Sequence, residues 1–141
     1  MGDRICRGCK RFSFEVIDWN GYSDDQKRAI LARIEKLVVP IVETRFLIRS
    51  ESDLAAGLKR FGVPFNPESP PEIWLHSLLK KRFSRIESLS ELGVDIRPEW
   101  QAMTLAALAD DMDTQLLLLC DAHLQRYFPD RAGAELVGPL G

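Results

Sequence analysis

The sequence predicts an all-α protein, a single-domain helical bundle of about five helices with an N-terminal cysteine-knuckle arm. Apolar residues recur at steps of three and four along five segments, which is the spacing of amphipathic helices. Short polar loops rich in proline or glycine separate these segments. The chain has 141 residues, of which 45% are apolar and 28% charged, as expected for one soluble globular domain.

This pattern divides the chain into three parts. Residues 1–22 form the cysteine-knuckle arm, residues 23–128 form the helical bundle, and residues 129–141 form a flexible tail with little apolar surface to order it. Within the arm, Phe12, Phe14 and Val16 alternate with polar residues. This alternation allows either a short strand and turn or an irregular segment held by Trp19 and Tyr22. We expect any strand in the protein to be confined to residues 12–18.

The first bundle helix begins with a capping box. Ser23 can accept the first free amides and Gln26 can reach back to the backbone of Ser23. Pro40 lies inside the apolar pattern and cannot donate to the carbonyl of Lys36, so we expect a kink or break near Leu37. The apolar face of this helix consists of Ile30, Ile34, Leu37, Val38, Ile41 and Val42.

Two more helices follow on either side of a proline-rich loop. The second is predicted over residues 52–61, with Gly62 as its stop. The third begins at Ser69-Pro70-Pro71-Glu72, with Ser69 and Glu72 as capping residues, and its pattern allows continuation as far as Leu92.

The last two predicted helices share a junction rich in aspartate. One runs from Pro98 to Leu108, and the other is capped by Asp113 and ends before Pro129. Cys120 lies in the leucine face of the last helix, where a free cysteine usually serves as a small hydrophobe.

Cys6 and Cys9 form a Cys-x-x-Cys segment, whose two thiolates can bind one metal ion from a single turn. Zinc and iron–sulphur irons take about four ligands, so this segment supplies half of a site. A thioredoxin-like redox role is less favoured, because no βαβ pattern surrounds the pair. Two unmetallated thiols remain the third interpretation.

Residues 5–34 resemble a bacterial family of unknown function, number 1289, whose members are often labelled predicted iron–sulphur proteins. The resemblance implies that Cys6 and Cys9 are metal ligands and that a helical extension follows. The family also places a first cysteine pair shortly upstream; only Met1 to Ile5 precede Cys6 here, so we expect an incomplete zinc or iron–sulphur site unless the natural chain starts earlier. The matching residues are Cys6, Arg7, Gly8, Cys9, Lys10, Glu15, Trp19, Ser23, Gln26 and Lys27.

Cations form two candidate binding faces for an anionic partner. Residues 1–50 hold ten Lys and Arg against seven Asp and Glu, and the sequence LLKKRFSR supplies a second cationic stretch. A solvated surface explains both groups as well as a binding role does. The candidate binding residues are Arg7, Lys10, Arg11, Lys80, Lys81 and Arg82.

These observations predict a cytoplasmic, non-enzymatic accessory protein with a metal-binding knuckle. No segment has the ~20 apolar residues needed to cross a bilayer, so no membrane partner is expected. The alternative is a helical adaptor without metal. It would bind a protein partner, or less favourably nucleic acid, through its basic N-terminal face. Pairing of two arms in a dimer is compatible with either reading.

Overall fold

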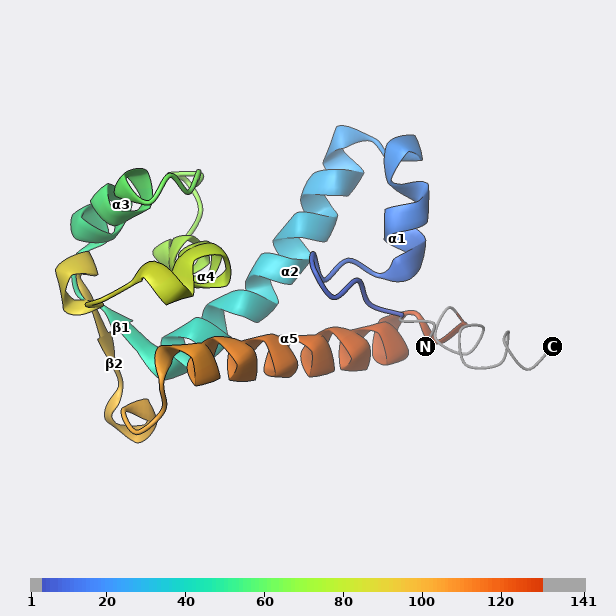
Figure 1. Ribbon diagram of the computed structural model, residues 1–141. Helices are drawn as coiled ribbons and strands as arrows, with labels where there is room; N and C mark the ends of the chain where they lie inside the picture. Colours follow the sequence, from blue (N-terminus) through green and yellow to red (C-terminus); the bar gives the residue numbers. More distant parts are fainter. Residues whose placement is uncertain (1–3, 131–141) are drawn as a thin grey trace. The chain divides into compact units, whose positions relative to one another are not determined.

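The computed structural model describes residues 4–130, which form a mainly α-helical fold (Figure 1). The predicted all-α class is confirmed. No helix in these residues is long and apolar enough to span a membrane. The elements in order are α1 (Ser13–Asp18), α2 (Asp24–Arg45), β1 (Phe46–Ile48), α3 (Glu51–Arg60), α4 (Pro71–Arg82), β2 (Val94–Ile96) and α5 (Leu105–Tyr127), with 3-10 turns at Trp19–Gly21, Phe83–Arg85, Ser90–Leu92 and Pro98–Trp100.

The described chain divides into two compact units. The first contains residues 4–37 and 114–130, and the second contains residues 38–113. Helices α2 and α5 each contribute residues to both units. Of the predicted flexible tail, Pro129 and Asp130 are described, and residues 131–141 lie outside the described residues.

The first unit has an aromatic core around Phe12, which is fully buried. The ring of Phe12 lies 5.7 Å from that of Phe14 and 5.5 Å from that of Phe128, measured between centroids. The expected strand or irregular segment over residues 12–18 is instead helix α1. Its start is stabilised by Glu15, whose carboxylate accepts the backbone N–H of Phe12 at 2.8 Å. This local bond outweighs the strand-like alternation of apolar residues.

Helix α2 begins with the predicted capping box. The amide of Gln26 donates to Ser23 Oγ at 3.1 Å, and the amide of Ser23 donates to Gln26 Oε1 at 2.8 Å. Of the predicted kink or break near Leu37, the break is wrong, because the helix continues through Pro40 to Arg45; the kink stays a prediction. A proline inside a helix costs about 3 kcal/mol. Burial of Ile41 and Val42 just after Pro40 offsets that cost.

The second unit contains the two short strands of the protein's small sheet. β1 and β2 pair antiparallel, with Phe46 opposite Ile96 and Ile48 opposite Val94. The expectation that any strand would fall within residues 12–18 is therefore wrong. Helix α3 packs on α4 and on the turn Ser90–Leu92.

Three helix boundaries in this unit differ from the prediction. Helix α4 ends at Arg82 and does not continue to Leu92, and its N-cap is Pro70, with no side-chain cap from Ser69. The predicted fourth and fifth helices form one helix, α5, with Asp113 in its interior. The cap at its start is Thr104, whose Oγ1 accepts the amide of Ala107 at 3.1 Å.

Candidate metal centre

Cys6 and Cys9 lie on a hairpin formed by the first described residues. Ile5 and Phe12 pair across it as an antiparallel bridge, and the amide of Cys6 donates to the Arg11 carbonyl at 2.7 Å. The turn is closed by the amide of Lys10, which donates to the Cys6 carbonyl at 2.7 Å. Lys10 has a left-handed backbone with φ of 65°, which lets the chain reverse direction directly after Cys9.

The two thiols of the hairpin lie three positions apart on one closed turn. Both thiols are free and half-buried, and the Cys6 side chain forms a hydrogen bond with that of Cys9. Burial by itself raises the pKa of Cys9. Hydrogen bonds from Cys6 and Arg11 together outweigh burial, and the pKa of Cys9 lies below its usual value. This favours the thiolate, the form of cysteine that binds metals.

Arg11 fixes the position of the Cys9 sulfur. Its Nε donates to Cys9 Sγ at 3.2 Å, and its guanidinium carbon lies 4.4 Å from the ring centroid of Trp19. Lys27 lies 5.6 Å from the same centroid, and Tyr22 meets the Trp19 ring edge-on. A stacked guanidinium has few accessible rotamers, so the N–H group that faces the sulfur is held in place.

Glu15 fastens the hairpin to the helices. Its buried carboxylate accepts two hydrogen bonds from the Arg33 guanidinium, at 2.6 and 2.7 Å, besides the one from the Phe12 amide. The Arg33 guanidinium carbon also lies 3.9 Å from the centroid of the Phe12 ring. Sequence reasoning placed Glu15 in the family pattern without a role, because its partner is 18 residues away and no local spacing indicates the pair.

Cys120 and His123 belong to the same unit but serve its packing. Burial raises the pKa of Cys120 to about 11, so its thiol stays protonated at neutral pH. His123 lies between aromatic rings, 4.6 Å from the Tyr127 centroid and 6.1 Å from that of Phe12. Burial and the nearby Arg33 charge lower the pKa of His123. Among residues 4–130, no group of three or more His, Cys, Asp or Glu side chains is arranged to hold a metal ion.

The predicted cations of the arm have three different environments. Arg7 is exposed, while Arg11 is committed to Cys9 and Trp19. Lys10 is only 3% exposed and its ammonium donates to the Arg7 carbonyl, so the expectation of an accessible cation at this position is corrected. Its burial follows from the left-handed turn, which directs the side chain back across the hairpin.

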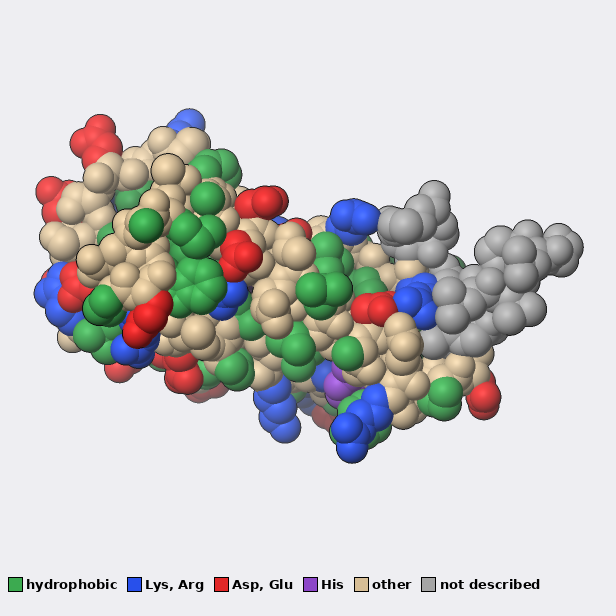
Figure 2. Space-filling view, turned by 90° about the horizontal axis from the view of Figure 1, so that it is seen from below, with side chains coloured by type: hydrophobic (Ala, Val, Ile, Leu, Met, Phe, Trp, Pro, Cys, Tyr) green, Lys and Arg blue, Asp and Glu red, His purple; other side chains and the backbone are tan. Residues whose placement is uncertain are grey.

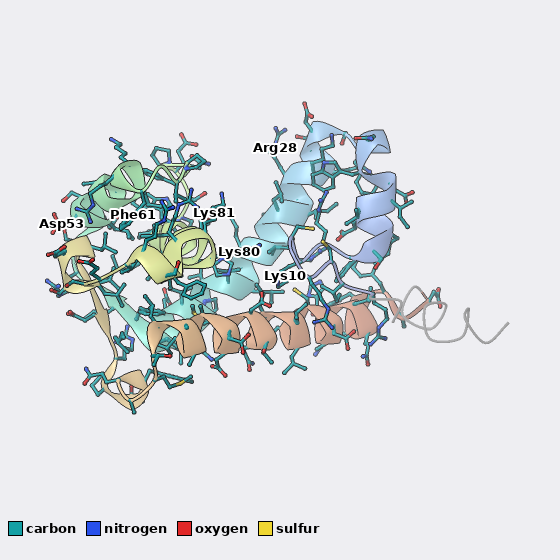
Figure 3. All side chains as sticks on the ribbon, viewed as in Figure 1. Lys10, Arg28, Asp53, Phe61, Lys80 and Lys81 are labelled. Carbon is teal, nitrogen blue, oxygen red and sulfur yellow. The ribbon has the colours of Figure 1, made fainter. Side chains whose placement is uncertain are left out.

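The second cationic group lies at the end of α4, in the other unit. Lys80 and Lys81 are exposed in its last turn, and Arg82 is half-buried (Figure 3). Cations at this position stabilise the negative end of a helix dipole, which gives them a structural role without a ligand. On the face drawn in Figure 2, basic and acidic side chains are interspersed among hydrophobic ones, so neither positive nor negative charge dominates that face.

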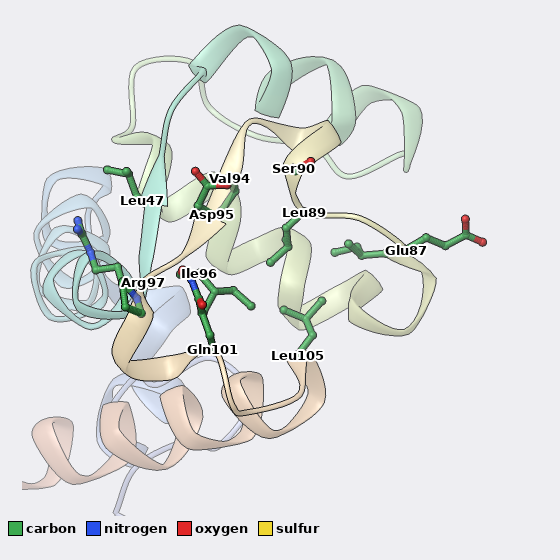
Figure 4. A pocket seen from close by; sticks show the side chains of 12 residues that line it. Leu47, Glu87, Leu89, Ser90, Val94, Asp95, Ile96, Arg97, Gln101 and Leu105 are labelled. Atoms are coloured by element: carbon green, nitrogen blue, oxygen red, sulfur yellow. Dashed lines mark hydrogen bonds between the residues drawn. The ribbon is translucent and has the colours of Figure 1, made fainter.

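A pocket of about 670 Å³ lies beside β2 in the second unit (Figure 4). Three of its polar side chains are engaged in the fold: Asp95 pairs with Arg49 at 2.5 Å, and Gln101 donates to the Ile96 carbonyl at 3.0 Å. Arg97 Nε donates to the Glu43 carbonyl at 2.5 Å. None of the predicted site residues lines this pocket. Its polar groups therefore support the sheet, and the hairpin remains the candidate site.

Comparison with known proteins finds a family match over the first part of the chain. Residues 1–37 match the sequence profile of a family described as protein of unknown function (DUF1289). This confirms the resemblance seen in residues 5–34, and the matched segment contains the whole hairpin, α1 and the first part of α2. No curated protein and no solved structure matches the chain.

Proposed function

We propose that this chain, whose residues 1–37 belong to the DUF1289 family, is a non-enzymatic accessory protein that binds zinc through Cys6 and Cys9. The observation that carries the proposal is the placement of two free thiols on one closed turn of a short hairpin. Zinc prefers thiolate ligands, and one turn that presents two of them is a common half of a tetrahedral site. Bound zinc would supply a structural cross-link.

The hairpin has features that suit a metal half-site. The N–H group of Arg11 faces Cys9 Sγ and can offset part of the charge that two thiolates share. Glu15 and Arg33 hold the base of the hairpin, so the sulfurs need little ordering on binding. We place the protein in a reducing cytoplasm, where such thiols remain available.

The proposed site is a half-shell. Two thiolates leave about two positions of a zinc shell open. We assign these positions to ligands supplied by a protein partner or by a second copy of this hairpin. A four-cysteine iron–sulphur cluster does not fit the donor set of residues 4–130, which offers two sulfurs at this place.

Zinc content tests the proposal. Protein purified under reducing conditions without chelator should be colourless and hold clearly less than one metal ion per chain. Titration with a chromophoric zinc competitor should show binding that Cys9→Ser weakens by at least about tenfold. Cys120→Ser is the matched control: this thiol is buried and its raised pKa keeps it protonated, so the substitution should leave zinc affinity unchanged. Equal zinc affinity in the native chain and Cys9→Ser would refute the site.

A second variant tests whether zinc affinity is limited by the presence of only two cysteine ligands. Extending the N-terminus by a further Cys-x-x-Cys segment, as in the family pattern, should raise zinc content towards one per chain. Cys9→Ser in that extended chain should lower it again. If the extended chain holds no more zinc than the native one, the hairpin is not half of a four-ligand site.

The exposed lysines of α4 favour a second candidate function, an adaptor without metal. Lys80 and Lys81 are adjacent, exposed cations in the last turn of α4, a feature that suits an acidic protein or a nucleic-acid backbone. Binding to a labelled acidic peptide or oligonucleotide should then fall with salt and with the double variant Lys80→Gln/Lys81→Gln. Unchanged binding in that variant would remove this candidate.

A further inference from the structure

The sulfurs of Cys6 and Cys9 are positioned for a reaction that the proposed metal site does not use. We propose that the hairpin is a reversible dithiol–disulfide pair, oxidised by small-molecule disulfides such as glutathione disulfide. This inference does not need the metal. Where the zinc site also holds, oxidation and metal binding exclude one another, because a disulfide has no free thiolate to offer.

The hairpin supplies the proximity that such a pair needs. The hydrogen bond from the Lys10 amide to the Cys6 carbonyl closes the turn that carries both cysteines, and the antiparallel bridge between Ile5 and Phe12 holds the two arms of the hairpin together. A disulfide has an S–S length of about 2 Å and tolerates only a narrow range of separations. Two cysteines three positions apart on one closed turn can reach that geometry by rotation about their side-chain bonds.

The fold also makes the pair accessible and aligned. Cys6 and Cys9 are both half-buried, whereas Cys120 is 1% exposed. Arg11 Nε, held by the stack of its guanidinium on Trp19, restrains the Cys9 sulfur from one side. Arg7 and Gly8, the two residues between the cysteines, are exposed among residues 4–130. Arg11 is therefore a positioning residue for this reaction.

The reaction takes place in two exchanges. The thiolate of one cysteine attacks glutathione disulfide, forming a mixed disulfide and releasing one glutathione thiolate. The second cysteine, as thiolate, then attacks the protein sulfur of the mixed disulfide, forming the Cys6–Cys9 bond and releasing the second glutathione thiolate. Two protein thiols are oxidised and one glutathione disulfide is reduced to two glutathiones, with two protons passing from the protein thiols to the products.

The test uses the full chain with a chelator present, so that metal plays no part. The protein is equilibrated in glutathione buffers of increasing disulfide content, quenched with acid, alkylated and measured by intact mass. The expected product is a monomer with one alkylated thiol, that of Cys120, and no attached glutathione. Reduced glutathione in excess should return all three thiols. A lasting glutathione adduct, a cross-linked dimer or three alkylated thiols at high disulfide content would each overturn the proposal.

Single variants give the two exchanges separate readouts. Cys6→Ser and Cys9→Ser should each accumulate the mixed disulfide that the native chain resolves. Arg11→Leu should resolve it several-fold more slowly than native, whereas Arg7→Leu, an exposed arginine of the same hairpin, should match native. Equal rates for Arg11→Leu and Arg7→Leu would remove the positioning role. Because zinc affinity is measured on reduced protein, failure of the disulfide leaves the zinc proposal standing, and the reverse also holds.

Discussion

At the scale of single residues, the hairpin depends on charged side chains that lie in the interior. Glu15 is 3% exposed and Lys10 is 3% exposed, which is unusual for these residue types. The free-energy cost of burying the Glu15 carboxylate is offset by the hydrogen bonds that it accepts from Arg33 and from the amide of Phe12. A buried carboxylate with a two-bond arginine partner and a backbone donor has a single favourable geometry. The carboxylate of Glu15 therefore fixes the orientation of the hairpin relative to α1, which follows it in the chain.

We expect Glu15→Ala to destabilise the protein by about 3–5 kcal/mol, because it leaves the charge of Arg33 buried without its partner. Glu15→Gln should cost less, since an amide oxygen can still accept from Phe12. The measurement is urea unfolding followed by circular dichroism. Asp25→Ala is the control: its pair with Arg28 is exposed, and its loss should change stability by at most about 0.5 kcal/mol. Similar losses for Glu15→Ala and Asp25→Ala would contradict the anchoring role.

The alkaline stability of the protein should depend on Cys120. Burial raises the pKa of Cys120 from 9.0 to about 11, so the folded chain keeps a proton that the unfolded chain loses in between. This contribution is complete below pH 9.0 and is lost as pH rises towards about 11. The stability advantage of the native chain over Cys120→Ala should shrink by the order of 2 kcal/mol across that range. Unfolding curves of both proteins check this, and a constant difference would show that Cys120 keeps its ordinary pKa.

At the scale of elements, side-chain caps decide where helices begin. Ser23 caps α2, Ser50 caps α3 by accepting the amide of Asp53 at 3.2 Å, and Thr104 caps α5. The capping box at Ser23 was predictable because both of its partners are local. Thr104 was overlooked, because the segment from Pro98 was assigned to a separate helix and forms only a short 3-10 turn.

Ser23→Ala should lower the free energy of unfolding by about 1 kcal/mol, because the amide of Gln26 loses its acceptor. Ser69→Ala provides the comparison. Sequence reasoning gave Ser69 the same capping role, but α4 has no side-chain cap there, so its loss should have little effect. Chemical unfolding of both variants measures the difference. Equal effects would mean that α2 gains nothing from its capping box.

At the scale of the whole molecule, the mainly helical fold described over residues 4–130 contains a small sheet. Its paired residues are 46 to 50 positions apart, from Ile48 opposite Val94 to Phe46 opposite Ile96. The turn before β2 requires Gly93, which has φ of +70° and lies against the backbone at Ser50. A Cβ on Gly93 would stand 2.8 Å from the Ser50 carbonyl oxygen. The sheet and the start of α3 are thus held together through a position without a side chain.

Gly93→Ala and Gly62→Ala separate backbone strain from packing. Both glycines have φ of +70°, so each substitution should cost about 1–2 kcal/mol in strain. Only Gly93 meets other atoms, since nothing lies within 4 Å of a Cβ at Gly62. We therefore expect Gly93→Ala to cost about 3 kcal/mol or more and Gly62→Ala to stay near the strain alone. Thermal unfolding checks the order, and equal costs would contradict the close approach to Ser50.

The sequence alone determined the helical class, the start of α2, the family segment and the identity of the two hairpin cysteines. These follow from local patterns: the helical period, a capping box over four residues and a Cys-x-x-Cys spacing. Tertiary structure decided the rest, because the deciding partners are distant in sequence. Arg33, 18 residues from Glu15, completes the anchor of α1, and pairing between residues 46 to 50 positions apart created β1 and β2. Burial removed Lys10 from the accessible cations, which its neighbours in the sequence do not indicate, whereas the leucine face around Cys120 already indicated that this thiol is buried.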